Sequence, residues 1–138
     1  MTWQYWALLS AFFAGLTAVL AKAGVKDIDS NLATAIRTVV ILIFAWSIVL
    51  ARPTTPLNSL TTRTWMFLVL SGLATGASWL CYFRALQMGE VSRVAPVDKL
   101  SVVVAMALSV LFFNEQLTWR HWLGGGLIVS GSIVLTRI

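Results

Sequence analysis

Three charged residues lie inside otherwise apolar stretches, and they are the residues best placed to do chemistry. Arg37 precedes the charge-free stretch 38–51, and Asp98 and Lys99 precede the charge-free stretch 100–114. Each stretch is shorter than the roughly 20 apolar residues that cross a bilayer, so the helices that contain them must take these charges into the membrane. An ionisable residue at such a depth is costly to bury and indicates a binding or ion-handling site.

The expected partner of Asp98 is Arg37, because both lie near the same end of their helices. Each is about 10 Å along the helix from a serine at that end, Ser92 and Ser30 respectively. Lys99 is not expected to pair with Asp98, since adjacent side chains on a helix point about 100° apart. Two interpretations stay open. Asp98 binds a proton or a cationic group while Arg37 and Lys99 bind an anionic one, or the charges form a structural ion pair and Lys99 extends to the lipid headgroups.

Weakly polar and aromatic side chains could line a pathway beside these charges. Ser101 follows Asp98 at helical spacing. Trp6 and Ser10 share a face of the first predicted helix, and Trp79 and Tyr82 lie near one end of the third. The candidate lining residues are Ser101, Trp6, Ser10, Trp79 and Tyr82. An aromatic wall with a few hydroxyl groups suits an amphipathic organic ligand. The same pattern also occurs where aromatic side chains only pack against other helices.

Two further residues are expected to have structural roles. Pro96 lacks a backbone N–H, so it either disturbs the helix that carries Asp98 or occupies that helix's first turn, where proline is tolerated. Glu115 precedes the last apolar segment, and an acidic side chain there interacts favourably with the positive end of the helix dipole. We therefore expect Glu115 to cap the last helix.

The remaining polar residues exclude several classes of function. No serine has a histidine or lysine base at a useful spacing, so we expect no enzyme activity and no cofactor. The lone His121 and the single Cys81 form no metal-binding cluster, and one cysteine permits no internal disulfide. The sequence pI is about 10.2. Because the basic residues are scattered rather than clustered, this charge does not predict nucleic-acid binding.

The elements that must position these residues are membrane-spanning helices. Of the 138 residues, 59% are hydrophobic and 11% charged, and the mean hydropathy is +0.85, which is unlike a soluble domain. We predict an all-α polytopic membrane protein with one domain, residues 1–138, in which Ser30 is the N-cap of the second helix. The five predicted transmembrane helices are residues 3–21, 32–50, 65–86, 94–113 and 119–136.

The charge distribution gives a weak orientation signal. With five spans, the two ends of the segment face opposite sides, and the basic residues are only slightly enriched on the side away from the N-terminus. The N-terminal side has Arg52, Arg63 and Arg120, and the other has Lys22, Lys26, Arg84, Arg93 and Arg137. Such a small difference permits insertion in both orientations. Small residues, including Gly72 and Gly76, predict close helix contacts.

Several motifs resemble the EamA family of the drug/metabolite transporter superfamily. They are Phe83-x-Ala85-Leu86, the proline-bearing Arg93–Ser101 helix, Glu115 before the last loop, and the glycine-rich Trp122–Gly131 helix; Gly15–Lys22 and Asp29–Arg37 in the first half are also similar. Asn114 replaces the glycine that the family commonly has before Glu115. Typical members have two inverted five-helix repeats, whereas this chain resembles the five-helix branch of bacterial and archaeal transporters.

The resemblance implies a secondary transporter, expected to export a small metabolite across the inner membrane. A single repeat would work as an antiparallel homodimer, which supplies ten helices around one pathway and permits alternating access. Its partners would be the lipid bilayer and a small-molecule substrate. Two alternatives remain: an accessory membrane subunit that transports nothing, and a flippase for a lipid-linked substrate.

Overall fold

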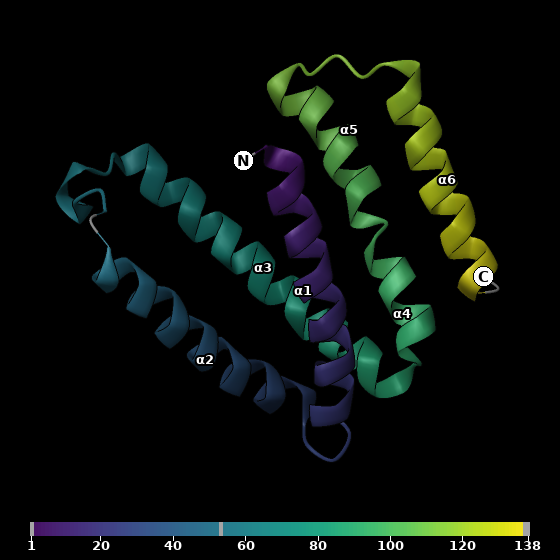
Figure 1. Ribbon diagram of the computed structural model, residues 1–138, viewed down its shortest axis with the longest axis horizontal. Coiled ribbons are helices and arrows are strands. Elements are labelled where there is room, and N and C mark those ends of the chain that lie inside the picture. Colours follow the sequence, from purple (N-terminus) through teal and green to yellow (C-terminus); the bar gives the residue numbers. More distant parts are fainter. Residues whose placement is uncertain (1, 53, 137–138) are drawn as a thin grey trace. The chain divides into compact units, whose positions relative to one another are not determined.

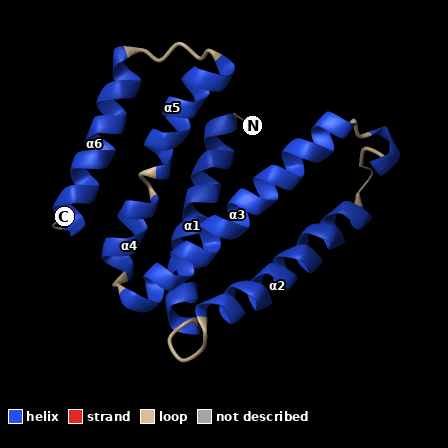
Figure 2. Ribbon diagram, turned by 180° about the vertical axis from the view of Figure 1, so that it is seen from behind, coloured by secondary structure: helices blue, strands red, loops and turns tan. Residues whose placement is uncertain are grey.

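The computed structural model describes residues 2–52 and 54–136, and throughout this part every regular element is a helix (Figures 1 and 2). The elements are α1 (Trp3–Gly24), α2 (Ser30–Ala51), the 3-10 helix η1 (Leu57–Ser59), α3 (Thr62–Met88), α4 (Val91–Asp98), α5 (Ser101–Phe113) and α6 (Trp119–Thr136). The all-α prediction is confirmed for these residues. Arg137, which entered the charge distribution, lies outside them.

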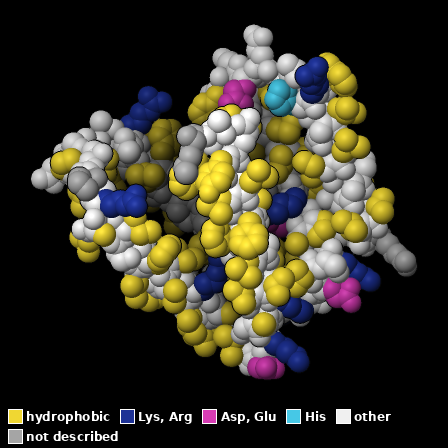
Figure 3. All heavy atoms as spheres, viewed as in Figure 1, with side chains coloured by type: hydrophobic (Ala, Val, Ile, Leu, Met, Phe, Trp, Pro, Cys, Tyr) yellow, Lys and Arg dark blue, Asp and Glu magenta, His cyan; other side chains and the backbone are white. Residues whose placement is uncertain are grey.

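The exposed surface of the helices is that of a membrane protein. Large hydrophobic side chains stand exposed along the helices, among them Leu50 at 80% and Phe113 at 77%. On the face drawn in Figure 3, hydrophobic side chains cover much of the visible helix surface. Apolar patches of this extent are not tolerated in water by soluble monomers. Lipid or another protein must cover them.

Four helical segments are long and apolar enough to cross a membrane: α1, α2, α3, and α4 together with α5. The predicted fifth span coincides with α6, residues Trp119–Thr136, but α6 is not among the four. Arg120, His121 and the glycine run 124–126 lower its hydropathy. By length and composition, the structure thus supports four of the five predicted spans.

The chain divides into two compact units, one of residues 21–87 and one that combines residues 2–20 with 88–136. The first unit contains α2 and α3. The N-cap of α2 is Asp29, whose carboxylate accepts the backbone N–H groups of Asn31 and Leu32 at 2.9 and 3.1 Å. The expectation of Ser30 was therefore wrong by one residue, since Ser30 begins the helix and is buried. The single domain over residues 1–138 stays a prediction.

The second unit contains α4, α5 and α6, and it corrects the predicted continuous helix over residues 94–113. That segment is broken at Lys99 and Leu100, where Figure 2 shows a loop between α4 and α5. α6 packs along α4 and also reaches α5. A Cβ atom added at Gly125 would lie 3.6 Å from Met106 and 3.9 Å from Val103 of α5, so this glycine permits a close helix contact.

The residue that departs from the family pattern has a physical explanation in this unit. Asn114 ends α5 with φ 51° and ψ 32°, in the left-handed region. Glycine adopts this conformation freely, and asparagine is one of the few other residues that tolerate it. Asparagine therefore keeps the helix end that a glycine would give.

Candidate functional site

The first charged site lies within the unit of residues 21–87 and is an arginine stacked on aromatic rings. The guanidinium carbon of Arg37 lies 4.7 Å from the centroid of the Trp79 ring and 5.0 Å from that of Phe83. Trp79 and Phe83 are four residues apart on α3, so they share one face of the helix. The sequence singled out Arg37 and Trp79 separately, and the structure brings them together.

Within the unit of residues 21–87, the structure gives Arg37 no ion-pair partner. In the part of the chain that the structure describes, the ion pairs are Glu90–Arg93 and Asp98–Lys99, and both lie in the other unit. A guanidinium held over aromatic faces gains an electrostatic attraction and keeps planar N–H donors that suit carboxylate or phosphate oxygens. Chemically, the site can bind an anionic group next to an aromatic surface.

A tightly packed cluster at the end of α3 supports the Arg37 site. Phe83 is 2% exposed, and Leu86 and Val25 are fully buried. The Gln87 amide donates to the carbonyls of Val25 and Ile28 at 3.1 and 2.6 Å, which joins the segment between α1 and α2 to α3. These interactions fix the α3 face that carries Phe83.

Two other side chains complete this end of α3. The Lys22 ammonium donates to the Leu86 carbonyl at 2.6 Å, one of the carbonyls in the last turn of the helix. Tyr82 is half-buried, and its ring stands edge-on to Phe83 with centroids 6.5 Å apart. Lys22 thus has a helix-capping role that the sequence did not indicate, and Tyr82 lies beside the ring that contacts Arg37.

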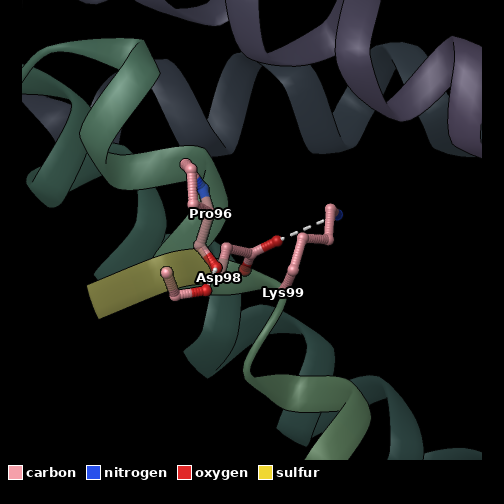
Figure 4. Close-up of polar contacts among 4 residues, drawn as sticks. Pro96, Asp98 and Lys99 are labelled. Carbon is pink, nitrogen blue, oxygen red and sulfur yellow. Dashed lines mark hydrogen bonds and ion pairs between the residues drawn. The ribbon is translucent and has the colours of Figure 1, made fainter. Parts of the chain in front are cut away.

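The second charged site lies at the break between α4 and α5. The Lys99 ammonium is 3.3 Å from the Asp98 carboxylate, an ion pair drawn as a dashed line in Figure 4. The expectation that these neighbours do not pair was wrong. It assumed a continuous helix, whereas Lys99 lies just after the end of α4, and its long side chain reaches back to the carboxylate.

Pro96 and Ser101 flank this ion pair. Pro96 is inside α4, five residues after its first residue, so of the two alternatives it does not occupy the first helical turn. Ser101 begins α5. The Pro96 carbonyl accepts a hydrogen bond from the hydroxyl of Ser132 in α6 at 2.9 Å. Sequence reasoning missed Ser132, although its spacing of seven residues from Gly125 places both on one face of α6.

Trp6 and Ser10 lie on the exposed surface of α1. Trp6 is 58% exposed, and its ring stands edge-on to that of Tyr5, with centroids 5.9 Å apart. Ser10 is exposed one turn further along. Their role in lining a pathway stays a prediction. The pairing of Arg37 with Asp98 also stays a prediction, since the two residues belong to different units.

The N-terminus of α6 is capped by residues other than Glu115. The His121 ring nitrogen Nδ1 accepts the Thr118 backbone N–H at 3.1 Å and lies 2.8 Å from the Thr118 hydroxyl. The recorded bond of Glu115 runs from its backbone N–H to the Ser109 carbonyl at 3.4 Å. Direct hydrogen-bonded capping, which was expected of Glu115, is therefore done by Thr118 and His121. An electrostatic contribution of Glu115 stays a prediction.

The described residues, 2–52 and 54–136, contain no cluster of side chains that is typical of a metal site. Within them, no three histidine, cysteine, aspartate or glutamate side chains are grouped so that they could hold a metal ion. Cys81 is a free, exposed thiol. The groups at the charged sites that could bind a ligand are a guanidinium, a carboxylate and an ammonium.

Comparisons with known proteins agree with an arrangement of apolar membrane-spanning helices. The model of the EamA-like transporter family matches residues 1–137. An uncharacterized transporter in the cobO 3' region of Sinorhizobium sp. is 56% identical over 97% of this chain and 96% of its own length. No solved structure matches.

More distant relatives match about half of the chain. A probable 4-amino-4-deoxy-L-arabinose-phosphoundecaprenol flippase subunit ArnE from Aeromonas salmonicida is 33% identical over 50% of this chain and 60% of its own length. An uncharacterized protein from Methanocaldococcus jannaschii is 31% identical over 51% of each chain. The match of the family model over nearly the whole chain is decisive: the chain belongs to the EamA-like transporter family.

Proposed function

We propose that this chain is a secondary transporter that moves a small anionic, amphipathic metabolite across the membrane, in the direction of export. The observation that carries the proposal is Arg37, a cation in a membrane-crossing helix whose recorded contacts are the rings of Trp79 and Phe83. Burying such a charge is energetically costly, and binding a transported anion is a function that would account for its presence there. An anionic group binds the guanidinium, while an apolar group lies against the rings.

The working unit in this proposal is an antiparallel homodimer. α6 crosses the membrane as the fifth span, so the two ends of the described chain lie on opposite sides. One copy then supplies one five-helix repeat, and two oppositely inserted copies supply the inverted pair that alternating access requires. The pathway would be lined by Asp98, Lys99, Ser101, Trp6, Ser10 and Tyr82 in addition to the Arg37 site.

Labelling of a single cysteine tests the dimer. In a Cys81→Ser background, Asn58→Cys introduces a thiol in η1, between α2 and α3. An antiparallel dimer predicts that an impermeant maleimide labels about half of the molecules from either side of the membrane. Labelling from one side only, in a fully active population, would rule this arrangement out.

Ligand-induced stabilisation tests the binding site. The purified protein is heated in detergent with a panel of carboxylated and phosphorylated metabolites, because a ligand that binds the native state raises the apparent Tm. We expect at least one anion to raise the Tm of the wild type and to have no effect on Arg37→Gln. Arg63→Gln is the matched control, since Arg63 is stacked on Phe67 at 5.8 Å near the start of α3. Equal shifts in all three proteins would contradict the proposal.

A flippase for a lipid-linked substrate is the second candidate, and the similarity to the ArnE relatives, which are probable flippase subunits, favours it. A polyprenyl phosphate also presents an anionic group next to an apolar chain, so Arg37 and its rings would suit it. Adding undecaprenyl phosphate to the panel distinguishes the two. Stabilisation by this lipid alone favours the flippase, and stabilisation by a water-soluble anion favours the metabolite transporter.

A further inference from the structure

The hydrogen bonds at the break between α4 and α5 leave one carbonyl in an unusual position. In a continuous helix the Pro96 carbonyl would accept the backbone N–H of Leu100, four residues later. Here the Leu100 N–H donates instead to Val97 at 3.0 Å. The Lys99 N–H is shared between the carbonyls of Ala95 and Pro96, at 3.3 and 3.2 Å. The Pro96 carbonyl has therefore lost its regular helical donor and keeps only its share of the Lys99 N–H.

The Ser132 hydroxyl of α6 replaces that donor. It donates to the Pro96 carbonyl at 2.9 Å, and Ser132 is 5% exposed. In Figure 4 a segment of α6 passes next to the end of α4, beside Pro96 and the Asp98–Lys99 pair. A bilayer offers no water to replace a lost helical hydrogen bond, so another group that supplies a donor stabilises the broken helix there.

We propose that Ser132 is a positioning residue that holds the helix broken and thereby fixes where Asp98 and Lys99 lie. Besides the shared Lys99 N–H, the Pro96 carbonyl can accept from the Leu100 N–H in a continuous helix or from the Ser132 hydroxyl in the broken one. Because Ser132 belongs to α6, a displacement of α6 along α4 decides between them. The inference deepens the proposed function and rests on it in one respect, namely that Asp98 and Lys99 belong to the transport site.

Three variants separate this role from ordinary packing. Ser132→Ala removes the donor, and Ser132→Thr keeps a hydroxyl. Ser130→Ala is the matched control, because the Ser130 hydroxyl is exposed and bonds only within α6, to the Gly126 carbonyl at 2.8 Å. All three are compared with the wild type in lipid nanodiscs by NMR of isotope-labelled protein.

The first readout is the carbonyl resonance of Pro96 and the exchange of the Ser101 amide. In Ser132→Ala the Pro96 resonance should move, and Leu100 should return to the Pro96 carbonyl. The Ser101 N–H then gains the Val97 carbonyl as its helical acceptor, so its exchange should slow by about threefold to tenfold, the range expected for one hydrogen bond. Ser132→Thr and Ser130→Ala should resemble the wild type at both positions.

The inference is overturned if Ser132→Ala and Ser130→Ala perturb Pro96 and Ser101 equally. If Ser132→Ala is not recovered folded, Ser132→Thr decides: a wild-type Pro96 resonance supports the inference, and a shifted one overturns it. The NMR readout needs no transported solute. A failure of the proposed function, in which no anion stabilises the wild type, therefore stays distinct from a failure of this inference.

The second readout links the break to the proposed site. An anion that raises the Tm of the wild type should do so less in Ser132→Ala, with the effect restored in Ser132→Thr. Full stabilisation of Ser132→Ala, together with a closed helix in the NMR readout, would overturn the positioning role.

Discussion

The two charged sites of this chain accommodate charge inside the membrane in different ways. Arg37 lies over Trp79 and Phe83, next to a buried cluster that fixes the end of α3. Asp98 and Lys99 lie at a helix break and pair with each other while substantially exposed, with side-chain exposures of 36% and 56%. The comparison teaches that the first site holds a positive charge against aromatic rings with no ion-pair partner inside its own unit, whereas the second site is an electrostatically neutral pair at a helix break.

The largest effect should come from removing an aromatic ring of the first site. We expect Phe83→Ala to lower the free energy of unfolding by about 3 kcal/mol, because a buried ring is replaced by a cavity. Phe67→Ala on the same helix is the matched control, since Phe67 is 55% exposed, and it should cost less than about 1 kcal/mol. Unfolding in mixed detergent micelles measures both. Equal losses would show that the cluster at the end of α3 is not specially stabilised.

The next prediction tests whether the two sites are coupled through a pair between Arg37 and Asp98. If they pair, Arg37→Gln and Asp98→Asn should each impair folding or transport more than Arg52→Gln does. The double variant should then lose less stability or transport than the two single losses added together. We expect a coupling of about 1 kcal/mol or more in a double-mutant cycle. The pairing fails if both single variants are harmless and the double variant is no better tolerated than the worse of them.

A smaller effect is expected at the start of α6. Thr118→Ala removes the hydroxyl partner of His121 and should lower stability by about 1 kcal/mol, the usual cost of a lost helix cap. Glu115→Gln should cost less and leave both yield and transport intact, because the structure gives the capping contacts to Thr118 and His121. Abolished transport with normal yield in Glu115→Gln would assign this carboxylate to the pathway instead.

The smallest effect on stability is expected for Lys99. Its partner is an adjacent and partly exposed carboxylate, and such pairs contribute roughly 0–1 kcal/mol. Lys99→Gln should therefore unfold at nearly the same detergent concentration as the wild type, in contrast to Phe83→Ala. A loss comparable to that of Phe83→Ala would mean that the second site stabilises the fold as much as the first and would remove the distinction between them.

Much of the fold could be predicted from the sequence because long apolar runs flanked by polar turns determine helix positions locally. Trp119–Thr136 was predicted with the limits that α6 has, and the first three helices were predicted within three residues at each end. The break at Lys99 and Leu100 was not predicted. Proline inside a helix is compatible with several outcomes, and the choice here involves Ser132, a residue far away in the chain.

The sites were predictable in their members but not in their contacts. Arg37 and Asp98 could be identified from the sequence because a charged side chain inside an apolar stretch is costly to bury and therefore indicates a functional or structural role. That Arg37 meets Trp79 and Phe83 depends on the packing of α2 and α3, which no local pattern encodes. The Asp98–Lys99 pair was rejected on a rule for continuous helices, and the rule fails where the helix ends.

Solute counterflow in proteoliposomes tests the central claim most directly. Vesicles with purified wild type, Arg37→Gln or Arg63→Gln are loaded with the anion that gives the largest Tm increase and are then diluted into the labelled anion. Our account predicts transient accumulation of label with the wild type and Arg63→Gln, and a loss of about tenfold or more with Arg37→Gln, since a charge-assisted hydrogen bond is removed. Absence of counterflow with the wild type, or equal counterflow with Arg37→Gln, would contradict it.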